Sequence, residues 1–343
     1  MKSRLILVWI LFVAAAVVVP AQTMIDVSNK QYVLPVSELL TTKTYPDIIT
    51  VTGAGIEAQL LPNRGRLLSG IRVKSAGVSA LYQSFNPVPM VLKSGLHAVE
   101  FGGYYLSIPW NTRDRQPYDL NYRIVENSAD RASVDISGED ILKRLSAASV
   151  VVMRYDRALV DIRSTIKNET KTRTIREPDF YDVLLLSPRE ETGGNAQLLL
   201  PSESVTVIES KDNWVGPQQQ SVPWTDALSR WSSVKGYYEV KAATSSQLPC
   251  FAILYPDQNL ALVKTWSPAD YFEAVDVVTY GPSYKQEAGI GAYFRVSCHK
   301  TNLELEPQAQ TEFRSAFVVI QNVEEGISLR SLYELAAAEE RKE

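Results

Sequence analysis

Between residues 48 and 320 the chain is a succession of short apolar runs separated by turn-forming residues. At 56–60, Ile56, Ala58 and Leu60 alternate with Glu57 and Gln59, which is the period of a strand with one buried face. Runs rich in β-branched and aromatic residues recur at 48–52, 67–73, 132–136, 150–154, 159–166, 183–186, 197–200, 205–208, 251–255, 260–264, 271–279, 290–296 and 313–320. No Gly/Ser linker or internal repeat divides them. The pattern therefore predicts one large all-β domain of antiparallel strands, over residues 48–322.

The C-terminal segment 323–343 has a different period. Its apolar residues from Ile327 to Ala336 recur at nearly helical spacing, ahead of the charged end 339–342. Ser328 is a residue type favoured at the N-cap. We expect one amphipathic C-terminal helix.

The N-terminal residues have the pattern of an export signal. Lys2 and Arg4 precede the apolar run 5–19, and small residues end it at Ala21. The run is shorter than the roughly 20 residues that a membrane-spanning helix needs, which favours a cleaved signal peptide over an anchor. No cysteine follows for a lipid. We expect a signal peptide at 1–21 cleaved after Ala21, no stable membrane insertion afterwards, an N-terminal extension at 22–47, and a periplasmic or extracellular protein.

Charge and residue types exclude several kinds of site. The net charge is −4 without a basic patch, so nucleic acid is not an expected partner. Two histidines far apart and no Cys-x-x-Cys argue against a zinc site, and no phosphate-binding or dinucleotide fingerprint follows a strand, so we expect no metal or cofactor. Export would permit a disulfide between Cys250 and Cys298, but we favour buried free thiols because a core this large needs no cross-link.

Four segments, in this order, resemble the galactose mutarotase-like (aldose 1-epimerase-like) superfamily. They are Leu60 to Ile71 followed by Ala80-Leu81-Tyr82, the Gly-Gly segment Phe101 to Pro109, the strand ending in Asn168-Glu169-Thr170, and Tyr271-Phe272-Glu273. The resemblance covers about residues 48 to 320. It implies a β supersandwich with a carbohydrate cleft on one face.

The resemblance also suggests catalytic residues. Opening a sugar ring requires a base and an acid, which are a Glu and a His in the enzymes of this superfamily. Glu273 matches the base. The window 176–182, where the histidine is expected, contains none, and Asp182 or Asp179 occupies its approximate place. An Asp donates a proton only if its pKa rises far above about 3.9, which argues against classical mutarotase catalysis.

The sugar-contacting residues implied by the resemblance surround these motifs. Trp110 and Arg113 follow the Gly-Gly segment, His97 precedes it, Arg64 lies in the first motif, and Tyr181 lies in the histidine window. Aromatic rings stack on sugar faces and charged side chains bind hydroxyls. His299, beside Cys298 at a strand end, is interpreted as structural. Further aromatic candidates in turn-like contexts are Trp214, Trp224, Trp231 and Trp266.

These observations favour an exported carbohydrate-binding protein, for a mono- or oligosaccharide, that lacks classical mutarotase catalysis. The alternative is a sugar-active enzyme with Glu273 as base, either an atypical aldose 1-epimerase or a polysaccharide lyase or hydrolase. A third possibility is an envelope protein that retains the fold alone.

Overall fold

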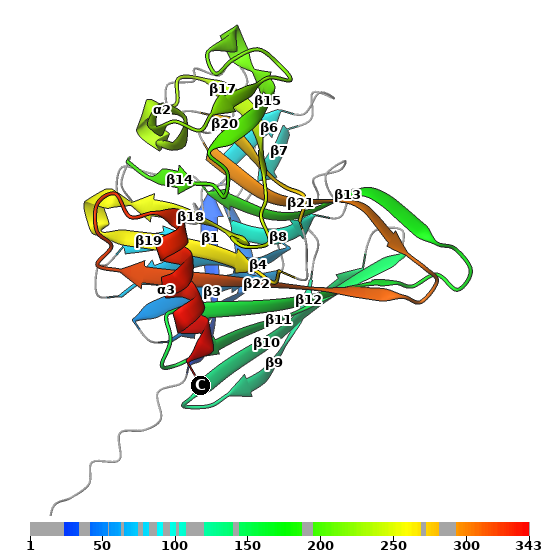
Figure 1. The fold of residues 1–343 in the computed structure, drawn as a ribbon. Coiled ribbons are helices and arrows are strands. Elements are labelled where there is room, and N and C mark those ends of the chain that lie inside the picture. The colour runs from blue at the N-terminus through cyan, green and yellow to red at the C-terminus, as the bar shows by residue number, and fades with distance from the viewer. Residues whose placement is uncertain are drawn as a thin grey trace, which may run out of the picture.

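The computed structural model describes residues 24–33, 42–53, 55–62, 65–74, 78–81, 88–91, 97–100, 103–107, 120–139, 144–186, 195–268, 272–280 and 293–342. The strands in these residues form a twelve-stranded sheet, an eight-stranded sheet and a two-stranded ribbon (Figure 1). Every strand pairing is antiparallel, as the alternating sequence pattern predicts. The predicted signal peptide lies outside the described residues.

The twelve-stranded sheet contains the strand pairs that position the candidate site. Its order is β1 (Ile25–Val33), β2 (Thr42–Thr52), β3 (Ile56–Leu61), β4 (Arg66–Val73), β8 (Gly103–Ser107), β13 (Ile175–Leu186), β21 (Tyr293–Leu305), β20 (Ala274–Tyr280), β17 (Tyr237–Ala243), β15 (Ser204–Ser210) and β16 (Ser221–Pro223), with β5 (Val78–Leu81) beside β4. Strand β1 and the start of β2 come from the predicted N-terminal extension.

The eight-stranded sheet packs against it. Its order is β14 (Gln197–Leu199), β18 (Cys250–Tyr255), β19 (Leu260–Trp266), β22 (Gln310–Gln321), β12 (Leu159–Asn168), β11 (Leu145–Arg154), β10 (Arg131–Glu139) and β9 (Asn121–Asn127). The ribbon pairs β6 (Val88–Val91) with β7 (His97–Glu100). Short helical segments, among them α2 (Asp226–Ser229), lie in the connections.

The core lies between the two sheets. Val240 and Val277 of the larger sheet and Leu262 and Phe317 of the smaller belong to one buried cluster. The ring of Tyr104 on β8 meets that of Phe317 edge to face, with centroids 4.9 Å apart. Because side chains alternate along a strand, the neighbours of these core residues point to the outer faces of the sandwich.

Helix α3 (Leu329–Arg341) covers the outer face of the eight-stranded sheet and is drawn in red in Figure 1. It buries Leu329, Leu332 and Ala336 in a second apolar cluster with residues of β18, β19 and β22. The hydroxyl of Ser328 accepts a hydrogen bond from the backbone N–H of Ser331 at 3.1 Å, so the predicted helix and its cap are confirmed. No helix in the described part of the chain combines the length and apolar content that crossing a membrane requires.

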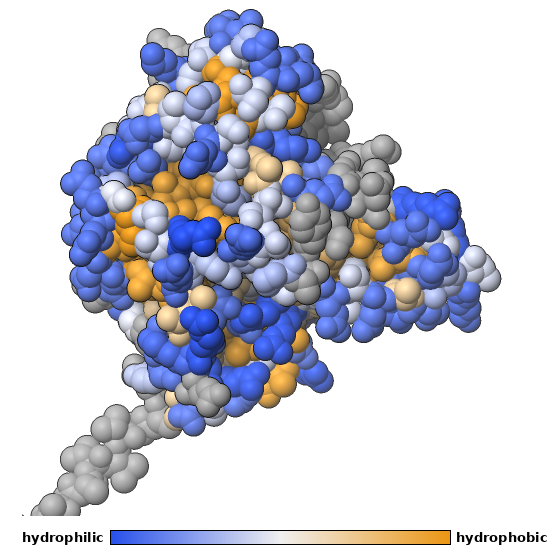
Figure 2. All heavy atoms as spheres, viewed as in Figure 1, coloured by the Kyte–Doolittle hydropathy of each residue, from blue (hydrophilic) through white to orange (hydrophobic). Residues whose placement is uncertain are grey.

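Four strands project together from the sandwich as an arm, formed by the far ends of the paired strands β12 and β22 of the smaller sheet and β13 and β21 of the larger (Figure 1). In the space-filling view, polar residues cover most of its tip (Figure 2). Asn168 is fully buried between the two turns at the far end of the arm, and its amide Nδ2 donates to the carbonyl oxygens of Arg173, Leu305 and Glu306 at 2.8, 2.9 and 3.1 Å. Its Oδ1 accepts from the backbone N–H of Thr170 at 2.9 Å. The Asn-x-Thr stretch therefore joins the two turns that lead from one sheet to the other, β12 to β13 and β21 to β22.

The Gly-Gly segment also has a structural explanation. Gly103 has a φ of +115°, and a Cβ at this position would lie 2.5 Å from the carbonyl oxygen of Leu68. Strand β8 meets β4 at this point, where Leu68 pairs with Tyr104. Only glycine combines this backbone conformation with so close an approach of the two strands.

Candidate functional site

The structure places the predicted site residues in three groups. Arg64, Trp110 and Arg113 lie outside the residues that it describes. His97 is the first residue of β7, in the ribbon, where it pairs with Val91. The others lie in or beside the twelve-stranded sheet.

Asp182 is on β13, but its side chain points between the two sheets and is 1% exposed. Its Oδ1 lies 2.9 Å from Nζ of Lys264 on β19. Its Oδ2 accepts hydrogen bonds from the hydroxyls of Ser315 at 2.7 Å and Tyr104 at 3.1 Å. An enclosed carboxylate with these partners cannot reach a sugar on the surface, so its position does not support the expectation that Asp182 is the catalytic acid.

The partner of Asp182 is equally enclosed. The ammonium nitrogen of Lys264 lies 5.5 to 5.9 Å from the centroids of four aromatic rings, those of Tyr104, Phe251, Trp266 and Phe272. Burial opposes its charge, but the carboxylate of Asp182 raises the pKa of Lys264 above its ordinary value. Lys264 also donates to Sγ of Cys298 at 3.3 Å. This cluster joins the two sheets and is structural.

A second charged cluster lies on the outer face of the twelve-stranded sheet. Lys241 of β17, Asp276 of β20 and His299 of β21 each neighbour a core residue in their strand, so they point outward. Nδ1 of His299 is 3.3 Å from Oδ2 of Asp276 and 3.3 Å from Nζ of Lys241. Nζ of Lys241 is 3.7 Å from Oδ1 of Asp276. We call these three residues the outer-face cluster.

The three side chains of the outer-face cluster differ in how much of their surface is exposed. The side chains of His299, Asp276 and Lys241 are 6%, 13% and 39% exposed, so the ammonium group is the one most open to a ligand. Nδ1 of His299 cannot accept from Lys241 while it donates to Asp276. The imidazole therefore has two alternative hydrogen-bonding arrangements, and Oδ1 of Asp276 accepts no hydrogen bond from a described residue. A carboxylate, an ammonium and an imidazole in contact can bind hydroxyl groups and exchange protons with them.

Two predicted residues lie beside this cluster. Tyr181 on β13 pairs with His299 in the sheet register, and on its other side with Ser107 of β8. Glu273 immediately precedes β20 rather than lying within it, its side chain is exposed, and its backbone N–H donates to the carbonyl oxygen of His299 at 2.9 Å. The structure therefore brings the strand positions of Tyr181, His299 and Glu273 together at one place in the sheet.

Sequence reasoning missed the three members of the outer-face cluster. His299 was expected to be structural because it follows Cys298 at a strand end. The available signal was the alternation itself, since a polar residue next to a core residue in a strand faces outward. Asp276 between Val275 and Val277 follows the same rule.

The four further tryptophan candidates, all within the described residues, are packed. Trp231 and Trp266 are 3% and 5% exposed. The indole N–H groups of Trp214 and Trp224 donate to backbone carbonyl oxygens, and both rings pack against Tyr238. Both cysteines are free and buried, as favoured from the sequence. Among the described residues, no His, Cys, Asp and Glu side chains gather in a group that could hold a metal ion.

Comparison by sequence finds no matching family model and no matching curated protein. Comparison of structures is more informative. A TPR-domain-containing protein from Parabacteroides distasonis superposes with a TM-score of 0.67 at 12% identity, over 87% of this chain and 55% of that one. The chain therefore spans about half the length of that protein.

Two other structures match over most of both chains. A candidate aldose 1-epimerase from Klebsiella pneumoniae has a TM-score of 0.56 at 9% identity, covering 94% of this chain and 89% of its own. A candidate mutarotase from Salmonella typhimurium has a TM-score of 0.53 at 11% identity, covering 80% and 90%. At such low identity the likeness shows the fold alone. Together with the two antiparallel sheets described above, it shows that the chain has a galactose mutarotase-like β-sandwich fold, far diverged in sequence.

Proposed function

We propose that this chain is an exported carbohydrate-binding protein whose ligand binds at the outer-face cluster. The observation that carries the proposal is the contact among Lys241, Asp276 and His299, beside the backbone positions of Tyr181 and Glu273. Charged side chains of these types form strong hydrogen bonds to sugar hydroxyls. The fold supports a sugar ligand by analogy, because the structural neighbours include a candidate mutarotase and a candidate aldose 1-epimerase.

Export is part of the proposal. The positively charged, apolar and small-residue segments at 1–21 are those of a cleaved signal peptide. A protein released outside the cytoplasm meets free sugars and glycan chains rather than intracellular sugar phosphates. The ligand is therefore proposed to be a mono- or oligosaccharide.

Saturation-transfer NMR with the mature chain and a panel of neutral mono- and oligosaccharides tests the binding. We expect saturation transfer from the protein to at least one sugar. The affinity for that sugar should fall about tenfold in Asp276→Asn, because a hydrogen bond to a charged group contributes about 1.5–3 kcal/mol. Arg123→Gln removes an exposed charge of the eight-stranded sheet and serves as the control. No signal from any sugar, or equal binding by Asp276→Asn, contradicts the proposal.

A second candidate function is sugar isomerisation at the same place. The observation that favours it is the position of the His299 imidazole, whose Nδ1 lies 3.3 Å from Oδ2 of Asp276. The backbone carbonyl oxygen of His299 also accepts the hydrogen bond from the backbone N–H of Glu273. These residues can supply the acid and the base that ring opening requires. The window 176–182, where the resemblance places the catalytic histidine, contains no histidine.

Anomer exchange measured in the same NMR samples separates the two candidates. If the chain is a sugar isomerase, the protein accelerates exchange between the α and β anomers, and both His299→Gln and Glu273→Gln remove the acceleration. Binding without acceleration leaves the chain as a binding protein.

A further inference from the structure

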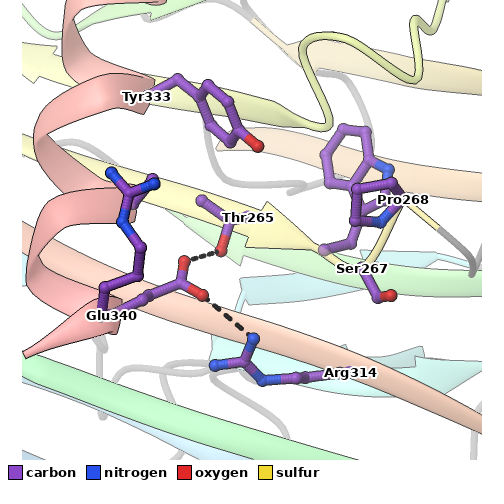
Figure 3. Close-up of a pocket in the computed structure, with 9 residues that line it drawn as sticks. Thr265, Ser267, Pro268, Arg314, Tyr333 and Glu340 are labelled. Carbon is purple, nitrogen blue, oxygen red and sulfur yellow. Dashed lines mark hydrogen bonds and ion pairs between the residues drawn. The ribbon is translucent and has the colours of Figure 1, made fainter. Parts of the chain in front are cut away.

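A pocket of about 270 Å³ lies on the opposite side of the molecule from the outer-face cluster, between α3 and the eight-stranded sheet (Figure 3). Its sides come from the end of β19 and the following turn, from β22 and from α3 between Tyr333 and Arg341. The lining residues are Thr265, Trp266, Ser267, Pro268, Arg314, Tyr333, Ala337, Glu340 and Arg341. Its volume approaches the range of small-molecule sites.

The acidic group in this pocket is already satisfied. Glu340 accepts a hydrogen bond from the hydroxyl of Thr265 at 2.6 Å and pairs with Nη1 of Arg314 at 3.0 Å. Figure 3 shows both interactions at the base of the pocket, with Tyr333 above them and Pro268 opposite. Arg314 also donates through Nε to Asp161 at 2.8 Å, which fixes the guanidinium in place. Little acceptor capacity is left for a cationic ligand.

The groups that remain free are donors. The hydroxyl of Tyr333 makes no hydrogen bond with a described residue, and burial raises its pKa, as does the nearby carboxylate of Glu340, so it is a neutral donor at physiological pH. Arg341, in the final turn of α3, forms no ion pair with any residue in the described ranges. The ring of Tyr333, Pro268 and Ala337 supply apolar surface beside these donors.

We propose that this pocket binds a small organic carboxylate. Its carboxylate accepts from the hydroxyl of Tyr333 and pairs with Arg341, and its hydrocarbon part lies against Tyr333 and Pro268. Arg314 is already paired with Glu340 and Asp161, so the guanidinium of Arg341 is the positive charge that remains for an anion. Because Tyr333 and Arg341 are on the helix and Pro268 is on the sheet side, an occupant also holds α3 against the sheet.

Calorimetry with the mature chain and two matched pairs tests the ligand class. The pairs are butyrate and butanol, and benzoate and benzyl alcohol. We expect saturable binding of at least one acid and none of its neutral partner, and slower proteolysis within α3 when that acid is bound. Acetate and sulfate are the size and charge controls and should bind more weakly.

Two helix variants test the location. Arg341→Gln and Tyr333→Phe should each weaken binding by about tenfold, as loss of a hydrogen bond to a charged group does. Lys342→Gln removes the same charge one residue further on, where Lys342 pairs with Glu339 outside the pocket, and should leave binding within about twofold.

Three results would overturn the proposal. One is the absence of saturable binding by any acid in a chain whose α3 is intact by circular dichroism. The second is equal weakening in Arg341→Gln and Lys342→Gln, which would indicate non-specific attraction of anions. The third is sulfate binding as tightly as the best carboxylate, which would indicate a general anion site. None of these results bears on sugar binding at the outer-face cluster.

Discussion

Lys264 and Asp182 form an ion pair across the interior of the sandwich, with 2.9 Å between Nζ and Oδ1 and 1% exposure on each side chain. They join a strand of the eight-stranded sheet to one of the twelve-stranded sheet. The pair is closed off by aromatic rings on the lysine side and by two hydroxyl groups on the aspartate side.

Removing one partner of this ion pair should destabilise the protein strongly. Lys264→Met leaves the Asp182 carboxylate buried without its cation, and we expect the free energy of unfolding to fall by about 3–5 kcal/mol in urea denaturation. Replacing both, as Lys264→Met with Asp182→Leu, should recover much of the loss, because a buried ion pair exchanged for apolar side chains is often neutral. The control Arg123→Met breaks a surface pair with Asp135 and should cost at most about 1 kcal/mol. A double variant no more stable than Lys264→Met alone would contradict this view of the pair.

Asn168 should matter more than its exposed neighbours. Asn168→Ala leaves three carbonyl oxygens of the arm without their donor, and we expect a loss of about 1–3 kcal/mol in the free energy of unfolding. Gln308 also donates to this turn, through Nε2 to the carbonyl oxygens of Glu169 and Thr170, but it is exposed. Gln308→Ala should therefore cost much less, because water replaces its bonds. Hydrogen exchange at 169–174 and 306–309 should accelerate in Asn168→Ala only.

Gly103→Ala tests the close approach of β8 to β4. The new Cβ would meet the carbonyl oxygen of Leu68 at 2.5 Å in a backbone with φ of +115°. Strain of this kind costs about 1–3 kcal/mol, and the clash adds to it. Gly326 also has a positive φ, +78°, but open space around its Cβ position, so Gly326→Ala is the matched control with the backbone cost alone. Equal melting temperatures of the two variants would show that the contact with Leu68 is unimportant.

The two thiols should make stability fall at alkaline pH. Burial raises the pKa of Cys250 and of Cys298 to about 12, whereas an unfolded thiol titrates near 8.5. Between these values the unfolded chain loses its thiol protons and the folded chain keeps them, so the stabilising contribution is complete below about pH 8.5 and is lost as the pH rises toward 12. Urea denaturation at pH 7.5 and pH 10 should show this slope, and the double variant Cys250→Ala, Cys298→Ala should reduce it. Native thiols should also resist disulfide-exchange reagents at pH 9 until urea is added.

The sequence was sufficient for the all-β class because strand-forming runs recur along it, although β18 and β19 are buried along their whole length and show no alternation. Ile56 to Leu60 and the helix that begins after Ser328 could be assigned from local residues alone. The direction in which the Asp182 side chain points could not be assigned from local residues. Counting from Asn168 along the chain gives an approximate place, but one residue of difference sends a side chain to the opposite face of a strand. The sequence also holds no sign that Lys264, 82 residues away, supplies its partner.

The outer-face cluster escaped prediction for a related reason. Its members come from β17, β20 and β21, and only the order of strands in the sheet brings them into contact. A search that follows one motif at a time finds Glu273 and Tyr181, which are close to the cluster in space. It does not find Lys241, because nothing near it in the sequence resembles a motif.

The burial of Asn168 has a practical consequence for producing the protein. Asn168-Glu169-Thr170 is also an acceptor sequence for N-linked glycosylation. In a eukaryotic secretory host the glycan would be attached to the amide nitrogen that bonds three carbonyl oxygens at the far end of the arm, and the fully buried site has no room for a sugar chain. Modification of the nascent chain would therefore prevent the two turns from joining, whereas folding first would hide the acceptor. Bacterial expression avoids this competition.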